Sequence, residues 1–320
     1  MVSSNPGDRK LLATGICSPL ALNKINLNFL THISPVEADG SITSLCTEGA
    51  AGRATASLVE IHQSRSDTVK LQGDVSIFSI YPHGQQPQVT GGLLHALATK
   101  GIALLGLASS PSAISAVVFS GETENAISAC FNAFEFPAYR SPSDWYAAYE
   151  GKEHLLQKII ASYQEKVIRI YDIVQQSDLD LWSLMVPASW LRELGSAFSA
   201  LAELKVKMSF VAAVPAPEGR LAFSFCFPRA QAAEIRHGIS RQLGNVVLAR
   251  HEQVAALFIH GPHFGDRYGI ANSLASALEN GGVSLLAVGC TVSSISVIIP
   301  KEDLATAVEA LERTFQKSRT

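Results

Sequence analysis

The C-terminal part of the chain alternates between two patterns of hydrophobic and polar positions. Residues 254–260 form a short apolar run, and in 269–280 apolar residues recur at the spacing of one helix face, which predicts a strand and then a helix. The Gly281-Gly282 pair favours a helix end, because glycine readily adopts the left-handed conformation found there. Residues 283–288 and 294–299 predict two strands, and 304–315 a final helix. The predicted order is β-α-β-β-α.

The same order is predicted upstream, and part of the sequence repeats. The upstream elements are strand 179–186, helix 190–204, strands 206–211 and 220–227, and helix 228–243. Residues 75–135 align with 255–315, so that Phe78 matches Phe258 at an offset of 180 positions. A weaker match relates 16–30 to 173–187, each interpreted as two extended stretches around a polar break. These matches indicate a duplicated pair of units.

We therefore expect an α+β fold of repeated ferredoxin-like modules with antiparallel sheets, arranged as two pairs in tandem. The β-α-β-β-α order lacks one edge strand of the ferredoxin-like plan. The predicted units are a shortened module at 11–74, modules at 75–138, 167–250 and 251–317, and a linker at 139–166 with a helix over 145–160. Open sheet edges need a cover. This predicts a homodimer, or modules that pair within the chain.

Composition excludes several classes of protein. The chain has 320 residues, of which 47% are hydrophobic and 17% charged, enough apolar surface for two to four compact units. The net charge is -3 and no Lys/Arg cluster is present, which argues against nucleic acid as a partner. Apolar runs such as 102–108 are too short to cross a membrane, and residues 1–10 lack the apolar core of a signal peptide.

The five cysteines predict reduced thiols. They stand at positions 17, 46, 130, 226 and 290, with no close pair. An odd number at wide spacing is typical of a cytoplasmic protein without disulfides or a zinc site. We expect a cytoplasmic protein without a cofactor.

The repeated stretches resemble tandem ACT domains, in particular the paired ACT region at the C-terminal end of aspartokinases. The matching stretches are VSIFSIYPHG…GGLLHALATKGIAL…SAISAVVF, EGRLAFSFCFPRAQAAEI and VAALFIHGPHFGDRYGIANSLASALENGGVSLL…SSISVIIPKEDLATAVEAL. The resemblance covers most of 11–135 and 167–317 and implies ACT-type βαββαβ modules that bind an amino-acid effector. We expect the aspartokinase catalytic domain to be absent, since nothing upstream has its length or a phosphate-binding Gly-rich loop.

The loop between the first strand and first helix of each module is the predicted ligand site. Free N–H groups at a helix N-terminus and a nearby glycine suit a carboxylate. In the last module Arg267 could grip a carboxylate and Asp266 an ammonium group, although Asp266 could equally cap the helix and Arg267 be solvated. The candidate residues are His263, Gly265, Asp266, Arg267 and Tyr268, with His83, Gly84, Gln85 and Gln86 in the second module and Ser189 in the third. Ser189 lies where the family has an Asp-x-Pro-Gly-type turn.

Metal binding and catalysis have weaker support. His260, His263 and Asp266 could form a metal cluster, but a Gly-Pro turn separates the histidines and Ile80 replaces His260 in the other repeat. No Gly-x-Ser-x-Gly elbow is present. We therefore predict neither a metal site nor catalytic residues.

The leading hypothesis is a stand-alone regulatory or sensor protein, not an enzyme. It would bind an amino acid or similar small carboxylate at module interfaces and shift its association with itself or with a metabolic enzyme. One alternative is a ligand-free oligomerisation or interaction module of an amino-acid-metabolism enzyme, similar to an aspartokinase regulatory subunit. Another is an enzyme on a ferredoxin-like scaffold, which fold alone does not exclude.

Overall fold

A 13-stranded antiparallel sheet forms the centre of the molecule. The computed structural model describes residues 1–5, 12–35, 40–62, 68–149, 169–261, 267–291 and 294–317. The strand order is β4-β1-β3-β2-β13-β14-β12-β9-β11-β10-β6-β7-β5. The strands are β1 (Val2–Asn5), β2 (Phe29–Ile33), β3 (Ile42–Cys46), β4 (Thr68–Leu71), β5 (Val75–Ile80), β6 (Gly106–Ser109), β7 (Ile114–Phe119), β9 (Asp172–Pro187), β10 (Phe210–Ala216), β11 (Arg220–Pro228), β12 (Leu248–His260), β13 (Ala287–Thr291) and β14 (Ser294–Pro300). Two short strands, β8 (Arg169–Ile170) and β15 (Gln316–Lys317), form a separate parallel pair. Of the predicted α+β fold, the mixture of helices and strands and the antiparallel sheet are confirmed.

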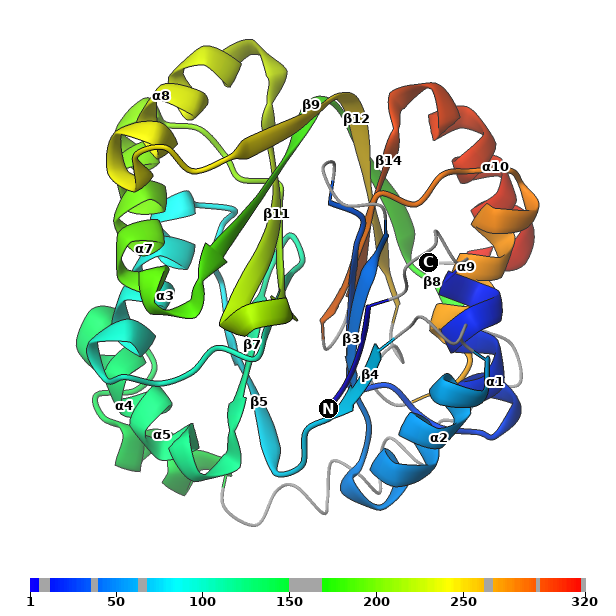
Figure 1. Cartoon of the computed structure of the whole chain (residues 1–320), viewed down its shortest axis with the longest axis horizontal. Coiled ribbons are helices and arrows are strands. Elements are labelled where there is room, and N and C mark those ends of the chain that lie inside the picture. The colour runs from blue at the N-terminus through cyan, green and yellow to red at the C-terminus, as the bar shows by residue number, and fades with distance from the viewer. Residues whose placement is uncertain are drawn as a thin grey trace.

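Helices cover the outside of the sheet. Its two halves face each other, with helices on the outer side of each (Figure 1). The α3 half contains β5, β7, β6, β10 and β11, and the α9 half contains β4, β1, β3, β2, β13 and β14. The α3 half carries α3 (Pro87–Thr99), α4 (Thr123–Ala133), α5 (Pro142–Tyr149), α7 (Leu191–Ala200) and α8 (Ala232–Leu243). The α9 half carries η1 (Ala13–Cys17), α1 (Ser18–Leu22), α2 (Gly52–His62), α9 (Ile270–Asn280) and α10 (Leu304–Thr314).

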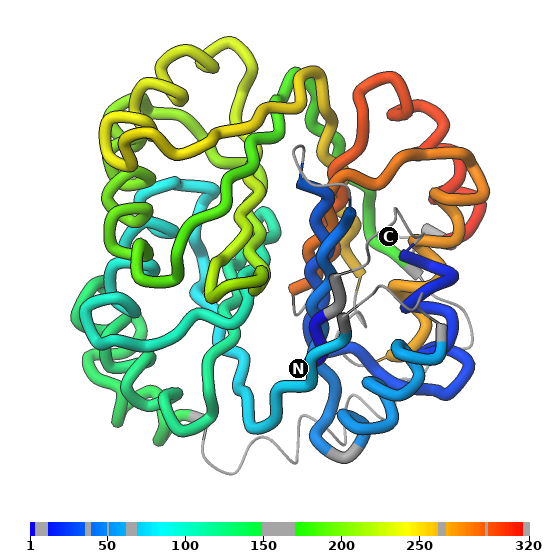
Figure 2. Tube along the Cα trace, in the orientation of Figure 1, coloured from blue at the N-terminus to red at the C-terminus, as the bar shows by residue number. Residues whose placement is uncertain are grey.

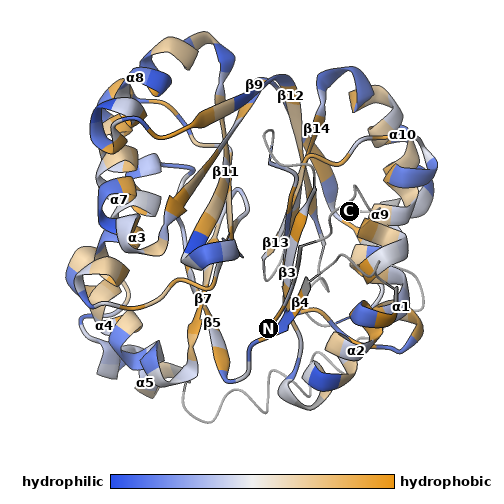
Figure 3. Ribbon diagram, viewed as in Figure 1, coloured by the Kyte–Doolittle hydropathy of each residue, from blue (hydrophilic) through white to orange (hydrophobic). Residues whose placement is uncertain are grey.

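The buried apolar residues form cores on both faces of the sheet. Hydrophobic residues follow the strands and the helix sides that face them (Figure 3). The core between the two half-sheets includes Ile33, Leu179, Leu181, Phe210, Phe258 and Ile298. Separate cores lie between each half-sheet and its helices. Because its strands are covered on both faces, the sheet is apolar along whole strands, such as SISVIIP in β14.

The modules pair differently from the tandem order that the sequence repeat suggests. β6 pairs with β10, which joins the second predicted unit to the third, and β2 pairs with β13, which joins the first to the last. In the chain trace the N-terminal segment, in blue, therefore lies beside α9, in orange (Figure 2). β4 and β5 lie at opposite ends of the strand order although residues 72–74 alone connect them.

Two long strands bridge the half-sheets. Residues Leu248–His251 of β12 pair with β9 in the α3 half, and after register shifts near Val254 the pairing continues in the α9 half. At the shift, the buried carboxylate of Asp180 accepts hydrogen bonds from Arg250 Nε at 2.9 Å and Nη2 at 2.5 Å, and from the backbone N–H of Gln253 at 3.1 Å. Gln253 has a positive φ of 58°. We call these three residues the Asp180 clamp.

Helix ends were predicted correctly where a glycine follows the helix. Gly282 (φ 73°) follows α9, and Val283 N donates to Leu278 O at 2.9 Å, which confirms the predicted helix end. Gly101 (φ 68°) ends α3 in the same way. The predicted helix at 145–160 is described only as α5, since 150–168 lie outside the described residues.

Other boundaries were wrong. Residues 16–22, expected to be extended, are helical: they belong to η1 and α1, which follow each other without a break, and Pro19 is the second residue of α1. β10 and β13 begin four residues later than predicted, at Phe210 and Ala287 rather than at 206 and 283. The first unit, expected to be shortened, has β1, the first helix, β2, β3, α2 and β4. Its β1 also lies before the predicted start at residue 11.

We predict that Asp180→Ala lowers the free energy of unfolding by about 3 kcal/mol, because it leaves the Arg250 guanidinium without its buried partner. Glu252→Ala is the matched control: Glu252 pairs with the same arginine at 3.3 Å, but its side chain is 52% exposed. It should cost about 1 kcal/mol at most. Urea denaturation measures both variants, and equal losses would show that the clamp has no special role.

Candidate functional site

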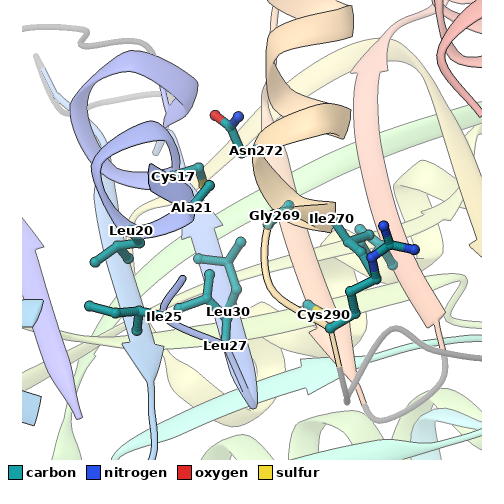
Figure 4. Close-up of a pocket in the computed structure, with 13 residues that line it drawn as sticks. Cys17, Leu20, Ala21, Ile25, Leu27, Leu30, Gly269, Ile270, Asn272 and Cys290 are labelled. Atoms are coloured by element: carbon teal, nitrogen blue, oxygen red, sulfur yellow. The ribbon is translucent and has the colours of Figure 1, made fainter. Parts of the chain in front are cut away.

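The N-terminus of α9 opens into a small cavity against the first helix (12–22, comprising η1 and α1). We call this contact the α9–α1 junction. The cavity is lined by Cys17, Leu20, Ala21, Ile25, Leu27, Leu30, Arg267, Gly269, Ile270, Ala271, Asn272, Cys290 and Ile295. In Figure 4, Gly269 and Ile270 face Cys17 and Ala21 of the first helix. A space of about 20 Å³ holds roughly one water molecule.

The first turn of α9 has no side-chain cap among the described residues. Gly269 (φ 87°) is the residue before the helix and has no side chain with which to cap it. The first N–H groups of a helix lack partners within the helix. Arg267 is half-buried and lines the cavity, which also adjoins the positive end of the α9 dipole. This combination suits a carboxylate.

At the C-terminal end of α9, a side chain caps the N-terminus of the first helix. Glu279 Oε1 accepts a hydrogen bond from Ala13 N at 2.8 Å, and the carboxylate also bonds the backbone of Leu12. Burial raises the pKa of Glu279, and these two hydrogen bonds oppose that rise. The N-terminus of the first helix thus already holds a carboxylate, whereas that of α9 faces the cavity.

Two thiols in the cavity wall are neutral. Burial is the main cause that raises the pKa of Cys17 and of Cys290 to about 12, and the Glu279 carboxylate adds to the rise for Cys17. A thiol with so high a pKa is a poor nucleophile at neutral pH. Cys17 and Cys290 therefore act as apolar wall residues beside Arg267.

The predicted residues of the last module fall partly outside the described structure. His263, Gly265 and Asp266 lie outside the described residues. Arg267 lines the cavity, while Tyr268 is 43% exposed. His260, considered as a metal ligand, bonds Ser294 Oγ through Nδ1 at 2.8 Å, and burial lowers its pKa. Within the described ranges, no group of three or more His, Cys, Asp or Glu side chains is placed to hold a metal.

The predicted residues of the second module form a loop closed by protein. His83 is buried, its Nε2 lies 2.6 Å from Ser110 O, and burial lowers its pKa. Gly84 and Gln85 have positive φ values of 59° and 57°. Gln85 O accepts a hydrogen bond from the N–H of buried Met208 at 2.8 Å. Gln86 precedes α3 without capping it through its side chain.

The helices beside this loop touch backbone to backbone. A Cβ atom on Gly91 of α3 would lie 2.5 Å from Gly195 O of α7. Such close packing leaves less room than at the α9–α1 junction. The third predicted loop is different again: Ser189 is exposed in a short 3₁₀ turn at 188–190, beside Trp190, whose exposed fraction is 38%.

Glu279 and Cys17 were missed as site residues. Ala13 and Glu279 are 266 positions apart, and the first helix was itself expected to be extended. The Gly281-Gly282 pair predicted the end of α9. No pattern in the neighbouring sequence predicts that Glu279 contacts another helix.

Comparisons with known proteins support the fold. A family model of the ACT domain matches residues 250–313. No curated protein matches the chain. The aspartate kinase of Synechocystis is similar in structure, with a TM-score of 0.78 and 13% identity over 100% of this chain and 55% of that one. The ligand-free regulatory subunit of aspartate kinase from Thermus thermophilus gives a TM-score of 0.41 at 18% identity, over 46% of this chain and 99% of that one.

These findings correct the expected function. The chain spans about half (55%) of the length of the Synechocystis kinase chain, and all of it matches there. This whole-chain match overturns the expectation of a stand-alone regulatory or sensor protein, and with it the expectation of a protein that is not an enzyme. The predicted absence of the aspartokinase catalytic domain is not supported either. No helix in the described ranges has the length and apolar character needed to cross a membrane.

We predict that Glu279→Ala lowers the free energy of unfolding by about 1 kcal/mol, as the loss of a helix cap does. Glu279→Gln should cost less, because the amide oxygen still accepts a hydrogen bond from Ala13. Glu60→Ala, at an exposed position of α2, is the control and should change stability by about 0.5 kcal/mol at most. If Glu279→Ala and Glu60→Ala unfold alike in urea, Glu279 does not cap the first helix.

Proposed function

We propose that this chain works as part of an aspartate kinase and that a small carboxylate, such as an amino acid, regulates the enzyme by binding at the α9–α1 junction. The match of the whole chain to an aspartate kinase at a TM-score of 0.78 carries this proposal. The ACT-domain match at 250–313 supports the effector, because it includes α9 and the adjoining strands.

The proposal includes four βαββαβ-like units close to the predicted ranges. The order β12-α9-β13-β14-α10 falls in the matched ACT region, and β5-α3-β6-β7-α4 repeats it. β1-η1/α1-β2-β3-α2-β4 and β9-α7-β10-β11-α8-β12 have the same order with a fourth strand. Units that pair through β6–β10 and β2–β13 place the first helices of two units side by side at each junction.

Charge favours the α9–α1 junction as the effector site, because Arg267 lines its cavity beside the first turn of α9. A larger cavity, lined by Pro187, Trp190 and Arg220 among others, lies beside the third loop. A bound carboxylate would accept hydrogen bonds from the first turn of α9 and a bidentate contact from Arg267. It would take the role at α9 that Glu279 takes at the first helix. A molecule larger than water needs the lining side chains to move. His263, Gly265, Asp266 and Tyr268 are proposed to complete this site, and His83, Gly84, Gln85, Gln86 and Ser189 stay predictions for weaker ones.

We predict that one or a few of the twenty amino acids raise the thermal unfolding midpoint in a saturable way. At a concentration a hundredfold above Kd, binding to the native state alone adds about 2.7 kcal/mol. The shift should vanish in Arg267→Ala and persist in Arg192→Ala, an exposed arginine on α7. A shift that survives Arg267→Ala would place the effector elsewhere, and no shift with any amino acid would contradict the effector.

We also predict that protein purified through this chain forms ADP from ATP only when aspartate is present. For this assay, the chain carries an affinity tag and is expressed in its source cells at its native level. The protein that the tag purifies, with anything bound to it, is then assayed. The stabilising amino acid should change that rate, and Arg267→Ala should retain the rate but lose the response. If ADP formation does not depend on aspartate, the chain does not work in an aspartate kinase, whether or not an amino acid binds.

A further inference from the structure

The larger cavity, which we call the β9 cavity, lies beside the C-terminal end of β9. Its space of about 540 Å³ falls in the usual range of small-molecule sites. Its described lining residues belong to β9, β11, β12, the end of α8 and three connecting segments. The cavity at the α9–α1 junction shares no described lining residue with it. The two cavities are therefore separate sites.

The β9 cavity lies where β9 has a neighbouring strand on one side only. β11 pairs with β9 as far as its last residue, Pro187. On the other side, β12 first pairs at Leu248, opposite Leu184, so that 185–187 have no partner in β12. The first strand of the last unit differs, since β12 pairs with both β14 and β9 as far as His260. The end of β9 thus has a gap that the end of β12 lacks.

Apolar side chains from both faces of the sheet line this gap. Leu184 and Leu243 belong to the core beneath the helices, and Met185 packs against the core between the half-sheets. Trp190 and Val247 also line the cavity, and both side chains are exposed. A planar ring in the gap would cover these apolar groups and could stack on the indole, which favours binding.

Among the described lining residues, Arg220 alone carries a charge. Its Nη2 lies 3.2 Å from Glu218 Oε2, but both side chains are exposed, and such an ion pair contributes little. Arg220 Nε is buried and has no hydrogen-bond partner in the described structure. A carboxylate suits this guanidinium, because its two oxygens can accept hydrogen bonds from Nε and Nη2 together.

The cavity is less suited to an amino acid. No aspartate or glutamate is found among the described lining residues. An α-ammonium group would therefore lose water without gaining an anionic partner, which is costly. This separates the ligand chemistry of the β9 cavity from that proposed for the α9–α1 junction.

We infer that the β9 cavity binds an aromatic carboxylate that has no ammonium group, with its ring against Trp190 and its carboxylate on Arg220. This site is independent of the amino-acid effector and of the kinase assay, since neither Trp190 nor Arg220 lines the α9–α1 cavity.

Isothermal titration calorimetry of the full chain with 3-phenylpropionate tests the site. We expect one saturable site per chain. Phenylalanine, which adds an ammonium group to the same skeleton, and 3-phenylpropanamide, which lacks the charge, should each bind at least tenfold more weakly. The comparison is repeated in Arg267→Ala, which removes the arginine of the α9–α1 junction and should leave the affinity for 3-phenylpropionate unchanged.

Substitutions in the cavity locate the binding. Arg220→Gln and Trp190→Ala should each raise the Kd for 3-phenylpropionate at least tenfold. Arg241→Gln, at an exposed arginine in the last turn of α8, is the matched control and should not change it. Thermal unfolding without ligand checks that each variant is folded. No saturable binding at millimolar concentration, or an equal Kd in wild type and Arg220→Gln, would overturn the inference.

Glu218→Gln separates recognition from a structural role of Arg220. Without the competing carboxylate, Arg220 should bind 3-phenylpropionate at least twofold more tightly, whereas damage to the fold would weaken binding. A Kd that does not fall would show that the carboxylate binds elsewhere. AMP, which joins a planar ring to a phosphate, tests the competing ligand class. Tighter binding of AMP than of 3-phenylpropionate would overturn the assignment of an aromatic carboxylate.

Discussion

The buried carboxylate of Asp180 lies where β9 and β12 pass from one half-sheet to the other, and its hydrogen bonds join the two strands there. It binds the Arg250 side chain and the backbone of Gln253, where β12 shifts its register on β9. The Arg250 guanidinium also lies over the Trp182 ring, 5.2 Å from its centroid, which ties the clamp to the core of the α3 half. With the strands bent here, the inner faces of the half-sheets enclose a common core, and the helices stay outside.

This arrangement puts the helices of distant segments in contact. The first helix and α9 are antiparallel neighbours, so each N-terminus lies near the end of the other helix. The two N-termini differ. Glu279 caps the N-terminus of the first helix, whereas a cavity lined by Arg267 and apolar residues adjoins the N-terminus of α9. On the α3 half, the glycine contact between α3 and α7 and the Met208–Gln85 bond close the related loop. The α9–α1 junction is therefore our proposed site for an external carboxylate.

The sequence predicts those features that local chemistry controls. The periodicity and glycine pair of α9 and the apolar runs of β14 and β11 give these elements nearly their observed bounds. Arg267 was found because a loop before a helix is a general anion site. The Asp180 clamp and the Glu279 cap depend on residues 70 and 266 positions away, which no local pattern links. The tandem order was misleading for the same reason, since strand pairing across the chain is a property of the whole sheet.

Hydrogen–deuterium exchange with and without the stabilising amino acid at saturation tests the proposed site most directly. If the carboxylate binds the first turn of α9, amides in 267–273 should exchange more slowly, together with those of the facing segment 17–27. The loop at 83–90 should be unchanged, because Met208 already closes it. Protection confined to 83–90, or no change at 267–273, would contradict the account.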